Sequence, residues 1–438
     1  MSQYRSYPAY KDSGVEWIGQ VPEHWEVKRL RHVGRYSNSG VDKKSYEDQQ
    51  TVELCNYTDV YYNEFISDDM PFMQATASTR EIEQFTLKKG DVIITKDSED
   101  PSDIGIPAFV PHDMPGVICG YHLTMIRALN DNYGSYIHRS LQSDHTKAHF
   151  FVESPGITRY GLNQNTIGNA PVALPPPDEQ ATIAATLDRE TARIDALIQK
   201  KTRFIELLKE KRQALITHAV TKGLDPNVKM KDSGVEWIGK VPEHWDVKPF
   251  FALVTELNRK NVGLVETNIL SLSYGNIIQK PETRNMGLTP ESYETYQIVE
   301  SGEIVFRFTD LQNDKRSLRS AQVTQRGIIT SAYMAVKPHS IDSTYFAWLM
   351  RSYDLCKVFY AMGGGLRQSL KFEDVRRLPV LIPPVDEQSE ITNIINAGTA
   401  RIDALVEKTE QSITLLKERR SAFITAAVTG QIDLRGEQ

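Results

Sequence analysis

The chain has 438 residues, of which 40% are hydrophobic and 25% are charged, a composition typical of a globular protein with roughly two to four domains. Its formal net charge of −6 argues against one large basic DNA-binding face, so any contact with nucleic acid must come from local patches or from partner proteins. No apolar run approaches the ~20 residues that span a bilayer, and the polar N-terminal stretch is not a signal peptide. The three separated cysteines offer no disulfide framework, so we expect a cytoplasmic protein.

An eighteen-residue leader, KDSGVEWIGQVPEHWEVK at residues 11–28, occurs again at residues 231–248 with sixteen identical positions. Each copy carries two tryptophans and a histidine, namely Trp17, His24 and Trp25 in the first and Trp237, His244 and Trp245 in the second. We expect buried aromatic side chains that anchor the entrance to the segment that follows, with a partner-docking surface as the alternative. The first copy should lie near the C-terminal end of the last helix, so that each copy closes one joint of the chain.

Two diverged blocks, residues 30–173 and 250–380, follow the leaders. Short β-type runs separated by Gly, Pro, Asn and Asp predict an α/β or α+β fold for both. The stretch LKKGDVIITK at 87–96 matches VESGEIVFRF at 299–308, each a turn followed by a strand. The two blocks therefore look like one fold with different surface chemistry, as two recognition modules with different targets would need.

Each block ends in a predicted long helix. Prolines and the acidic pairs Asp178-Glu179 and Asp386-Glu387 mark the helix starts, and Gly223 and Gly430 mark the ends. Both helices contain the sequence TARIDAL, at 191–197 and 399–405. Apolar residues recur at spacings of three, four and seven in both helices, as in a coiled coil. In the first helix they are Leu187, Ile194, Leu197, Ile198, Phe204, Ile205, Leu208, Leu215 and Ile216; in the second they are Ile395, Ile402, Leu405, Val406, Ile413, Leu416, Phe423 and Ile424.

The favoured arrangement is an antiparallel pair of these helices, each about 40 residues (~60 Å) long, related by an internal pseudo-two-fold. Two ordinary bundle helices are the alternative. The predicted division runs in chain order: 1–173, leader and first block; 174–222, first helix; 223–380, leader and second block; 381–438, second helix.

Signatures of common enzymes are missing from the sequence. There is no phosphate-binding loop with its lysine and no dinucleotide-binding glycine motif after a strand. Cys119 and His122 have a ligand-like spacing, but no second pair completes a zinc site. Acidic residues and lysines show no nuclease arrangement. We therefore expect a protein that is not itself an enzyme and binds no metal.

The paired leaders (SGVEWIG-x-VPEHW-x-VK), the paired helix starts (PP-x-DEQ) and the paired TARIDAL helices resemble the specificity subunit of type I restriction-modification systems, over essentially the whole chain. The resemblance implies that each block is a target recognition domain that reads one half of a split, asymmetric site on double-stranded DNA. The helices would set the spacing of the two halves and, with Glu179, Gln180, Glu387 and Gln388 of the repeated frame, dock two modification subunits. Those subunits would carry S-adenosylmethionine and methylate adenine; two restriction subunits using ATP and Mg²⁺ would join. This chain would bind no cofactor and no membrane.

Base-reading residues are expected among arginines, lysines and amides near glycine-containing loops, because arginine pairs with guanine and Asn or Gln with adenine. In the first block the candidates are Arg80, Lys96, Arg159, Tyr160, Asn163 and Gln164; in the second they are Lys315, Arg316, Arg319, Arg367, Gln368 and Lys371. For each of them, a solvated surface position or a salt bridge is the alternative. For the whole chain, the alternatives are a coiled-coil scaffold without a DNA role and an enzyme, such as a nuclease, with an unrecognised site.

Overall fold

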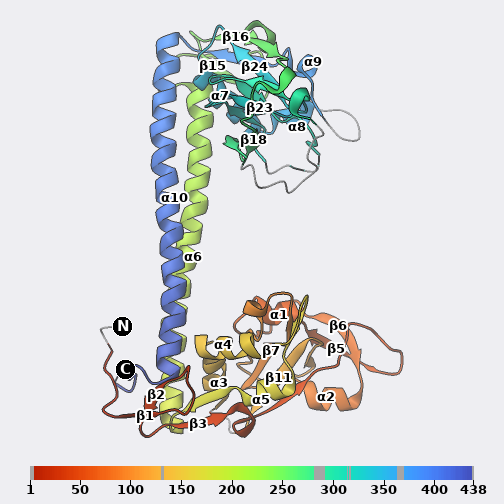
Figure 1. Ribbon diagram of the computed structural model, residues 1–438, viewed down its shortest axis with the longest axis vertical. Helices are drawn as coiled ribbons and strands as arrows, with labels where there is room; N and C mark the ends of the chain where they lie inside the picture. The colour runs from red at the N-terminus through yellow and green to blue at the C-terminus, as the bar shows by residue number, and fades with distance from the viewer. Residues whose placement is uncertain are drawn as a thin grey trace. The chain divides into compact units, whose positions relative to one another are not determined.

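Figure 1 shows the computed structural model, which describes residues 4–129, 133–280, 292–312, 314, 317–362 and 369–436. The chain forms two compact units: unit 1 comprises Met1–Lys201 and Gln411–Gln438, and unit 2 comprises Thr202–Glu410. Each unit therefore combines one leader, one variable block and one part of each long helix. The boundary between the units crosses both long helices. The segments predicted from the sequence instead assigned each helix as a separate part of the chain.

The variable block of unit 1 is built on a four-stranded sheet in the order β4-β11-β7-β9, beside a three-stranded sheet in the order β10-β5-β6. The first consists of β4 (Gly34–Asn38), β11 (Leu123–Ala128), β7 (Asp91–Thr95) and β9 (Pro107–Phe109); the second of β10 (Val117–Cys119), β5 (Gln50–Cys55) and β6 (Met73–Ala77). Its helices are α1 (Tyr57–Tyr61), α2 (Thr79–Phe85), α3 (Tyr133–Leu141), α4 (Asp144–Glu153) and α5 (Gln164–Asn169). A short ladder joins β8 (Asp97–Ser98) to β12 (Tyr160–Gly161).

The block of unit 2 repeats this plan with a four-stranded sheet in the corresponding order, β17-β24-β21-β22. These strands are β17 (Val254–Leu257), β24 (Met334–Pro338), β21 (Ile304–Phe306) and β22 (Ser320–Gln322). Two-stranded ladders join β18 (Leu270–Ser273) to β19 (Asn276–Gln279) and β20 (Gln297–Val299) to β23 (Gly327–Ile329), and the helices are α7 (Ser343–Leu355), α8 (Val358–Met362) and α9 (Phe372–Val375). The prediction of one mixed fold in both blocks is confirmed.

Each leader forms a hairpin and then a strand that pairs with the last strand of its block. The hairpins are β1 (Tyr10–Asp12) with β2 (Gln20–Pro22) and β14 (Met230–Asp232) with β15 (Lys240–Pro242). The following strand β3 (Glu26–Arg29) pairs antiparallel with β13 (Pro171–Leu174), and β16 (Asp246–Pro249) pairs with β25 (Pro379–Ile382). Because each ladder joins the two ends of a block, both blocks enter and leave the frame at one place.

The long helices are α6 (Pro177–Lys222) with 46 residues and α10 (Val385–Val428) with 44. Within unit 1, Arg420 of α10 lies 3.0 Å from Asp195 of α6, and within unit 2, Arg212 of α6 lies 2.9 Å from Asp403 of α10. From the first contact to the second the residue number rises from 195 to 212 on α6 and falls from 420 to 403 on α10, so the pairing is antiparallel, as predicted. Both helices are followed by a glycine with positive φ, Gly223 and Gly430, which suits the left-handed residue that ends a helix.

The predicted apolar stripe is only partly buried. Leu187, Leu208, Ile395 and Ile424 are buried, but Leu197, Phe204 and Leu405 expose 42, 44 and 40% of their surface. For these three side chains the expectation of burial between the helices was wrong, because one partner helix covers a narrower arc than the apolar face provides.

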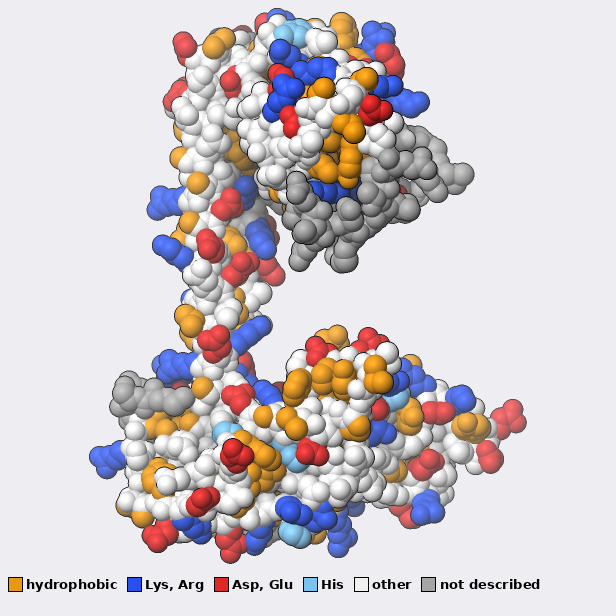
Figure 2. Space-filling view, in the orientation of Figure 1, with side chains coloured by type: hydrophobic (Ala, Val, Ile, Leu, Met, Phe, Trp, Pro, Cys, Tyr) orange, Lys and Arg blue, Asp and Glu red, His pale blue; other side chains and the backbone are white. Residues whose placement is uncertain are grey.

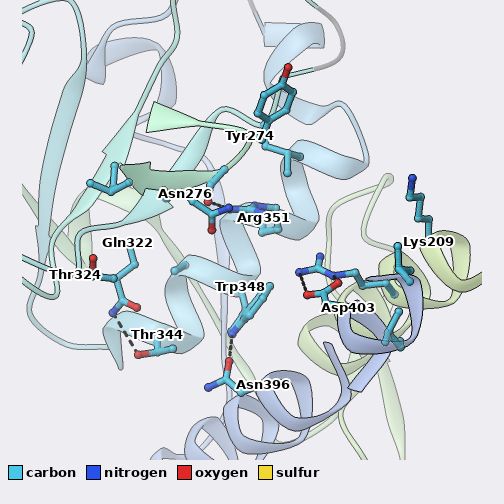
Figure 3. A pocket seen from close by; sticks show the side chains of 18 residues that line it. Lys209, Tyr274, Asn276, Gln322, Thr324, Thr344, Trp348, Arg351, Asn396 and Asp403 are labelled. Atoms are coloured by element: carbon cyan, nitrogen blue, oxygen red, sulfur yellow. Dashed lines mark hydrogen bonds and ion pairs between the residues drawn. The ribbon is translucent and has the colours of Figure 1, made fainter. Parts of the chain in front are cut away.

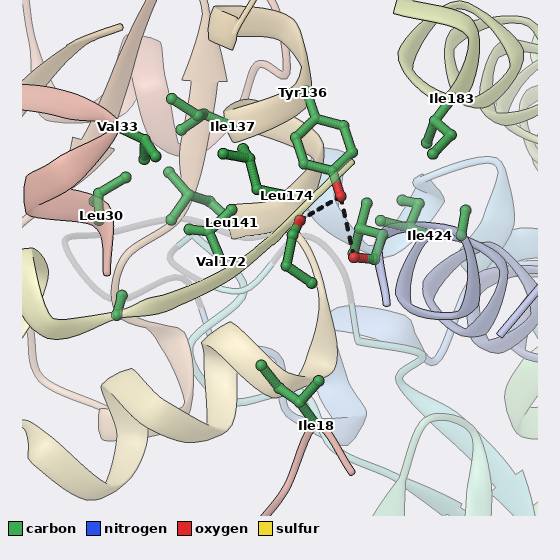
Figure 4. Close-up of a cluster of buried hydrophobic side chains, with 14 of the residues drawn as sticks. Ile18, Leu30, Val33, Tyr136, Ile137, Leu141, Val172, Leu174, Ile183 and Ile424 are labelled. Carbon is green, nitrogen blue, oxygen red and sulfur yellow. Dashed lines mark hydrogen bonds between the residues drawn. The ribbon is translucent and has the colours of Figure 1, made fainter. Parts of the chain in front are cut away.

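One core cluster of unit 1 lies within the block, and a second joins the leader, the block and the helices (Figure 4). Tyr136 of α3 stands at its centre, with its hydroxyl 2.6 Å from the carbonyl oxygen of Ala173 and 3.2 Å from that of Val428. Tyr345 of α7 makes the same pair of contacts in unit 2, with the carbonyl groups of Leu381 and Val220. A buried tyrosine thus ties the last strand of each block to the end of one long helix.

Candidate functional site

In unit 1 the leader closes onto the first turn of α6 through one buried carboxylate. Glu179, 7% exposed, accepts hydrogen bonds from the Tyr7 hydroxyl at 2.6 Å and the Trp25 indole N–H at 3.1 Å, and its other oxygen lies 2.8 Å from Nε2 of His24. Burial and the neighbouring carboxylate raise the pKa of Tyr7, so its hydroxyl remains a donor. The repeated histidine and tryptophan therefore recognise the repeated helix start of their own half.

In unit 2 the same joint is simpler. Glu387 accepts a hydrogen bond from the Trp245 indole N–H at 3.0 Å and lies 2.7 Å from Nε2 of His244, and its side chain is 22% exposed. The glutamines that follow the two carboxylates are buried and donate to a proline carbonyl of the helix approach, Gln180 at 2.7 Å and Gln388 at 2.9 Å.

The expectation of buried leader aromatics is confirmed for one tryptophan of each copy and wrong for the other. Trp25 and Trp245 have no exposed surface, whereas Trp17 and Trp237 are 48 and 46% exposed, because they sit in the hairpin turns. The predicted closure of the chain is confirmed within unit 1, where the Tyr10 hydroxyl donates to the carbonyl of Gly430 at 3.1 Å.

Three of the six base-reading candidates in the first block come together where β7 and β11 meet the β12 loop. Lys96 N–H donates to the carbonyl of His122 at 2.9 Å, and its ammonium lies 5.2 Å from the ring centre of Tyr121. Arg159 packs its Nη2 3.1 Å from Nδ1 of His122, and Tyr160 pairs in β12 with β8. We call Lys96, Tyr121, His122, Arg159 and Tyr160 the cation–aromatic cluster.

An acidic and tyrosine-rich cavity of about 430 Å³ opens beside this cluster, lined by Tyr57, Tyr61, Tyr62, Asp97, Asp103, His122 and Arg159 among others. Asp97 fixes the imidazole of His122, with Oδ2 2.6 Å from Nδ1. His122 has a φ of 69°, a strained conformation for a residue other than glycine and one that concentrates at functional sites. Figure 2 shows apolar side chains gathered over α1 at this end of the domain.

The other candidates of the first block are placed differently. Arg80 is exposed on α2, and Gln164 is exposed at the start of α5. Asn163 caps α5, accepting the N–H of Thr166 at 2.9 Å, so its amide oxygen is committed to the fold. Sequence reasoning missed Asp97, and it weighed His122 only as half of a metal site.

In the second block the structure corrects one prediction. Arg319 has no exposed surface; its guanidinium donates to the carbonyl of Thr309 at 3.1 Å, contacts the carbonyl of Asp314, and lies 3.2 Å from the hydroxyl of Tyr360. It shapes the loop that follows β21 and cannot reach a base from there. Lys371 is exposed before α9. Lys315, Arg316, Arg367 and Gln368 lie outside the described residues.

The TARIDAL aspartates are the cross-helix acceptors. Asp195 and Asp403 pair with Arg420 and Arg212 of the other helix, which explains why TARIDAL and the basic stretch near each helix end are duplicated together. In unit 1, Arg420 also binds Glu64 of the recognition block, as does the buried Arg139. Burial raises the pKa of Glu64, but the two arginines outweigh it and hold that pKa below its ordinary value.

Neither a metal site nor a membrane span emerges from the described part of the chain. Its His, Cys, Asp and Glu side chains form no group of three or more that could hold an ion. None of its helices is long and apolar enough to cross a bilayer.

The family model described as Type I restriction modification DNA specificity domain matches residues 22–207. The MjaX specificity subunit of a type I restriction enzyme from Methanocaldococcus jannaschii is 21% identical over 95% of this chain and 96% of its own length. The specificity subunit of the type I restriction enzyme EcoKI of Escherichia coli K12 is 20% identical, covering 94% of this chain and 90% of the relative.

Two solved structures share the fold. One chain, from work on the complex assembly and conformational transition of the type I R-M system, superposes with a TM-score of 0.68 at 13% identity, over 95% of this chain and 99% of that one. The HsdS subunit from Thermoanaerobacter tengcongensis superposes with a TM-score of 0.52 at 16% identity, over 94 and 98% of the two chains.

Proposed function

We propose that this chain is a DNA specificity subunit of a type I restriction-modification system, and that its two blocks each read one half of a bipartite, asymmetric site on double-stranded DNA. One observation carries the proposal: the frame is written twice almost unchanged, while the blocks it holds share a fold and differ in sequence. Two modules on a duplicated frame suit two half-sites on one duplex. The α6 and α10 helices, which carry both modules, would set the spacing of the half-sites.

An exchange of one block tests this division of labour. Residues 30–170 enter and leave the frame where Arg29 pairs with Pro171. A relative's block can replace them if it keeps Glu64, Tyr136 and Arg139, which contact the long helices. Assembled with its modification subunits, the hybrid is expected to methylate a site changed in one half only, mapped by sequencing methylated adenines. The reciprocal exchange of residues 250–378, bounded by the Pro249–Pro379 pair, should change the other half. A hybrid that alters both halves would contradict the modular assignment.

We place base reading by the first block at the cation–aromatic cluster. Its exposed Arg159 and half-buried Lys96 supply two cations, and Tyr121 and Tyr160 supply aromatic surface. The chain's net charge of −6 means that such local groups, together with partner proteins, must neutralise the phosphates.

Replacing Arg159 with alanine in the assembled complex should weaken binding by about 5- to 150-fold, the equivalent of 1–3 kcal/mol for a bidentate base contact, and relax preference at one position of one half-site. Lys96→Ala should weaken all sequences alike and reduce the salt slope by about one. Affinity for a panel of duplexes with single base changes, at two salt concentrations, separates the two effects. Arg203→Ala, whose guanidinium bonds Glu206 on the surface of α6, is the matched control and should change neither.

Partner subunits would dock on the helices. The exposed leucines recur in both copies at positions 208 residues apart: Leu197 and Leu405, and Leu207 and Leu415, with 40–64% of their surface exposed. Each unit thus offers one such leucine from each helix. Covering each leucine would contribute about 1.5–3 kcal/mol to the binding of a partner subunit. Because this surface is present twice, we expect two modification subunits per chain.

Catalysis would belong to those partners. The modification subunits would bind S-adenosylmethionine and methylate adenine, and two restriction subunits would use ATP and Mg²⁺ for translocation and cleavage. The chain itself would supply sequence recognition and geometry, within the cytoplasm. A mass measurement of the purified complex checks the stoichiometry, and a divalent-metal nuclease assay on the isolated chain should show no cleavage.

A further inference from the structure

Unit 2 contains a cleft of about 780 Å³ between its recognition block and its parts of α6 and α10. In Figure 3, Trp348 and Arg351 face it from α7, and Lys209 and Asp403 come from the long helices. Of the described residues that line it, Lys209, Arg212 and Arg351 are cationic and Asp403 is the one acid. The cleft therefore has a net positive lining.

Unit 1 has a corresponding cleft, and there the chain supplies its own carboxylate. The two clefts share four pairs of lining residues 208 positions apart: Lys209 and Lys417, Arg212 and Arg420, Asp403 and Asp195, and Val406 and Ile198. In unit 1, Glu64 also lines the cleft and binds Arg139 and Arg420 together. Because two arginines bind the one carboxylate of Glu64, a carboxylate suits this position of the cleft.

The described residues of unit 2 offer no counterpart of Glu64. Trp348 donates its indole N–H to Asn396 at 3.0 Å. In unit 1 the residue 208 positions before Asn396 is Asp188, and it binds Arg139 at 2.6 Å beside the cleft. Among the described residues, the carboxylate that Arg212 binds is that of Asp403, whose side chain is 56% exposed.

Arg351 adds a largely buried cation, and its neighbour Asp354 offsets the cost of that burial only in part. Its Nη2 donates to the carbonyl of Ser320 at 3.0 Å and contacts that of Gly275. Its Nε is buried without a hydrogen-bond partner among the described residues. Burial, helped by the neighbouring Arg212, lowers the pKa of Arg351 to about 10 and outweighs the raising effect of Asp354. A carboxylate entering the cleft would relieve this cost.

We propose that the unit 2 cleft receives an aspartate or glutamate side chain from a protein partner of the assembled complex, in the role that Glu64 plays within unit 1. Trp348, Ile402 and Val406 line the same cleft. They would contact apolar side chains of the partner that lie next to that acid. The proposal rests on the assembly with modification subunits proposed above. It adds that the two partner copies are held differently. The unit 1 cleft has its carboxylate from Glu64 of this chain, and the unit 2 cleft would receive one from the partner.

A zero-length carbodiimide cross-link tests the chemistry directly, because it joins a lysine to a carboxylate in contact with it. Lys209 and Lys417 are matched, both being exposed and each lining its own cleft. In the complex with modification subunits, mass spectrometry should find Lys209 joined to an acidic residue of the partner at least tenfold more often than Lys417. Lys209→Glu should weaken assembly about tenfold, and Lys417→Glu less than twofold.

The outcomes separate the two proposals. A specificity chain that does not copurify with modification subunits would overturn both. A complex that forms without the Lys209 cross-link, or with equal cross-linking of the two lysines, would overturn the carboxylate site alone. Protection of Lys209 from acetylation by duplex DNA without any protein partner would show a phosphate site instead and would also overturn it.

Discussion

Replacing Trp25 with alanine is expected to lower the free energy of unfolding of unit 1 by about 3–5 kcal/mol, the usual cost of removing a buried tryptophan. Its indole has no exposed surface and belongs to the core cluster that joins the leader to α6 and the end of α10. Its N–H is also one of the donors to Glu179, so the substitution leaves a buried carboxylate with one hydrogen bond fewer.

Hydrogen exchange read by mass spectrometry measures this effect for each unit separately. Protection should fall in the first leader and the start of α6, and remain in the second block. Trp17→Ala is the matched control, since that side chain is 48% exposed. It should lower the free energy of unfolding far less than Trp25→Ala does. In unit 2, Trp245→Ala should lower protection in the second leader and the start of α10, and leave the first block protected. Equal losses from Trp17→Ala and Trp25→Ala would contradict the buried joint.

Acid is expected to destabilise unit 1 through His138. The imidazole is 1% exposed, and burial, together with Arg139, lowers its pKa to about 3. Since the unfolded histidine titrates near 6.5, the unfolded state binds more protons below that pH, and stability falls as the pH drops from about 6.5 towards 3. Between pH 7 and pH 5 the loss is about 2 kcal/mol. Glu64 adds a loss only at lower pH, because its pKa is held below the ordinary value.

Denaturant unfolding at a series of pH values measures this slope. His138→Gln should cost some stability at pH 7 but flatten the dependence between pH 7 and pH 5. His112→Gln, at a histidine whose side chain is 46% exposed beside Asp68, is the control and should keep the wild-type slope. A His138→Gln protein with an unchanged slope would show that other groups cause the acid sensitivity.

Much of the frame followed from local sequence. The duplication, the helix starts at the proline and acidic residues, the glycine stops and the shared fold of the two blocks were all predicted from repeats, spacing and turn residues. These features depend on interactions between near neighbours in the chain, where periodicity and capping are decisive. Lys96, Arg159 and Tyr160 were named separately as candidate base-reading residues; the structure brings them together, and their role stays a prediction.

The doubled frame around two different blocks, and the resemblance to type I specificity subunits that this frame carries, could be read from local sequence. Tertiary structure decided which side chains are available. The leader tryptophans look alike in sequence, yet one is sealed against a glutamate 154 residues away and the other faces solvent. Arg319 looked like a reader of bases and is buried instead, and Glu64 fills one cleft but has no described counterpart in the other. Burial and ion pairing depend on contacts between residues far apart in the chain, which no local pattern encodes.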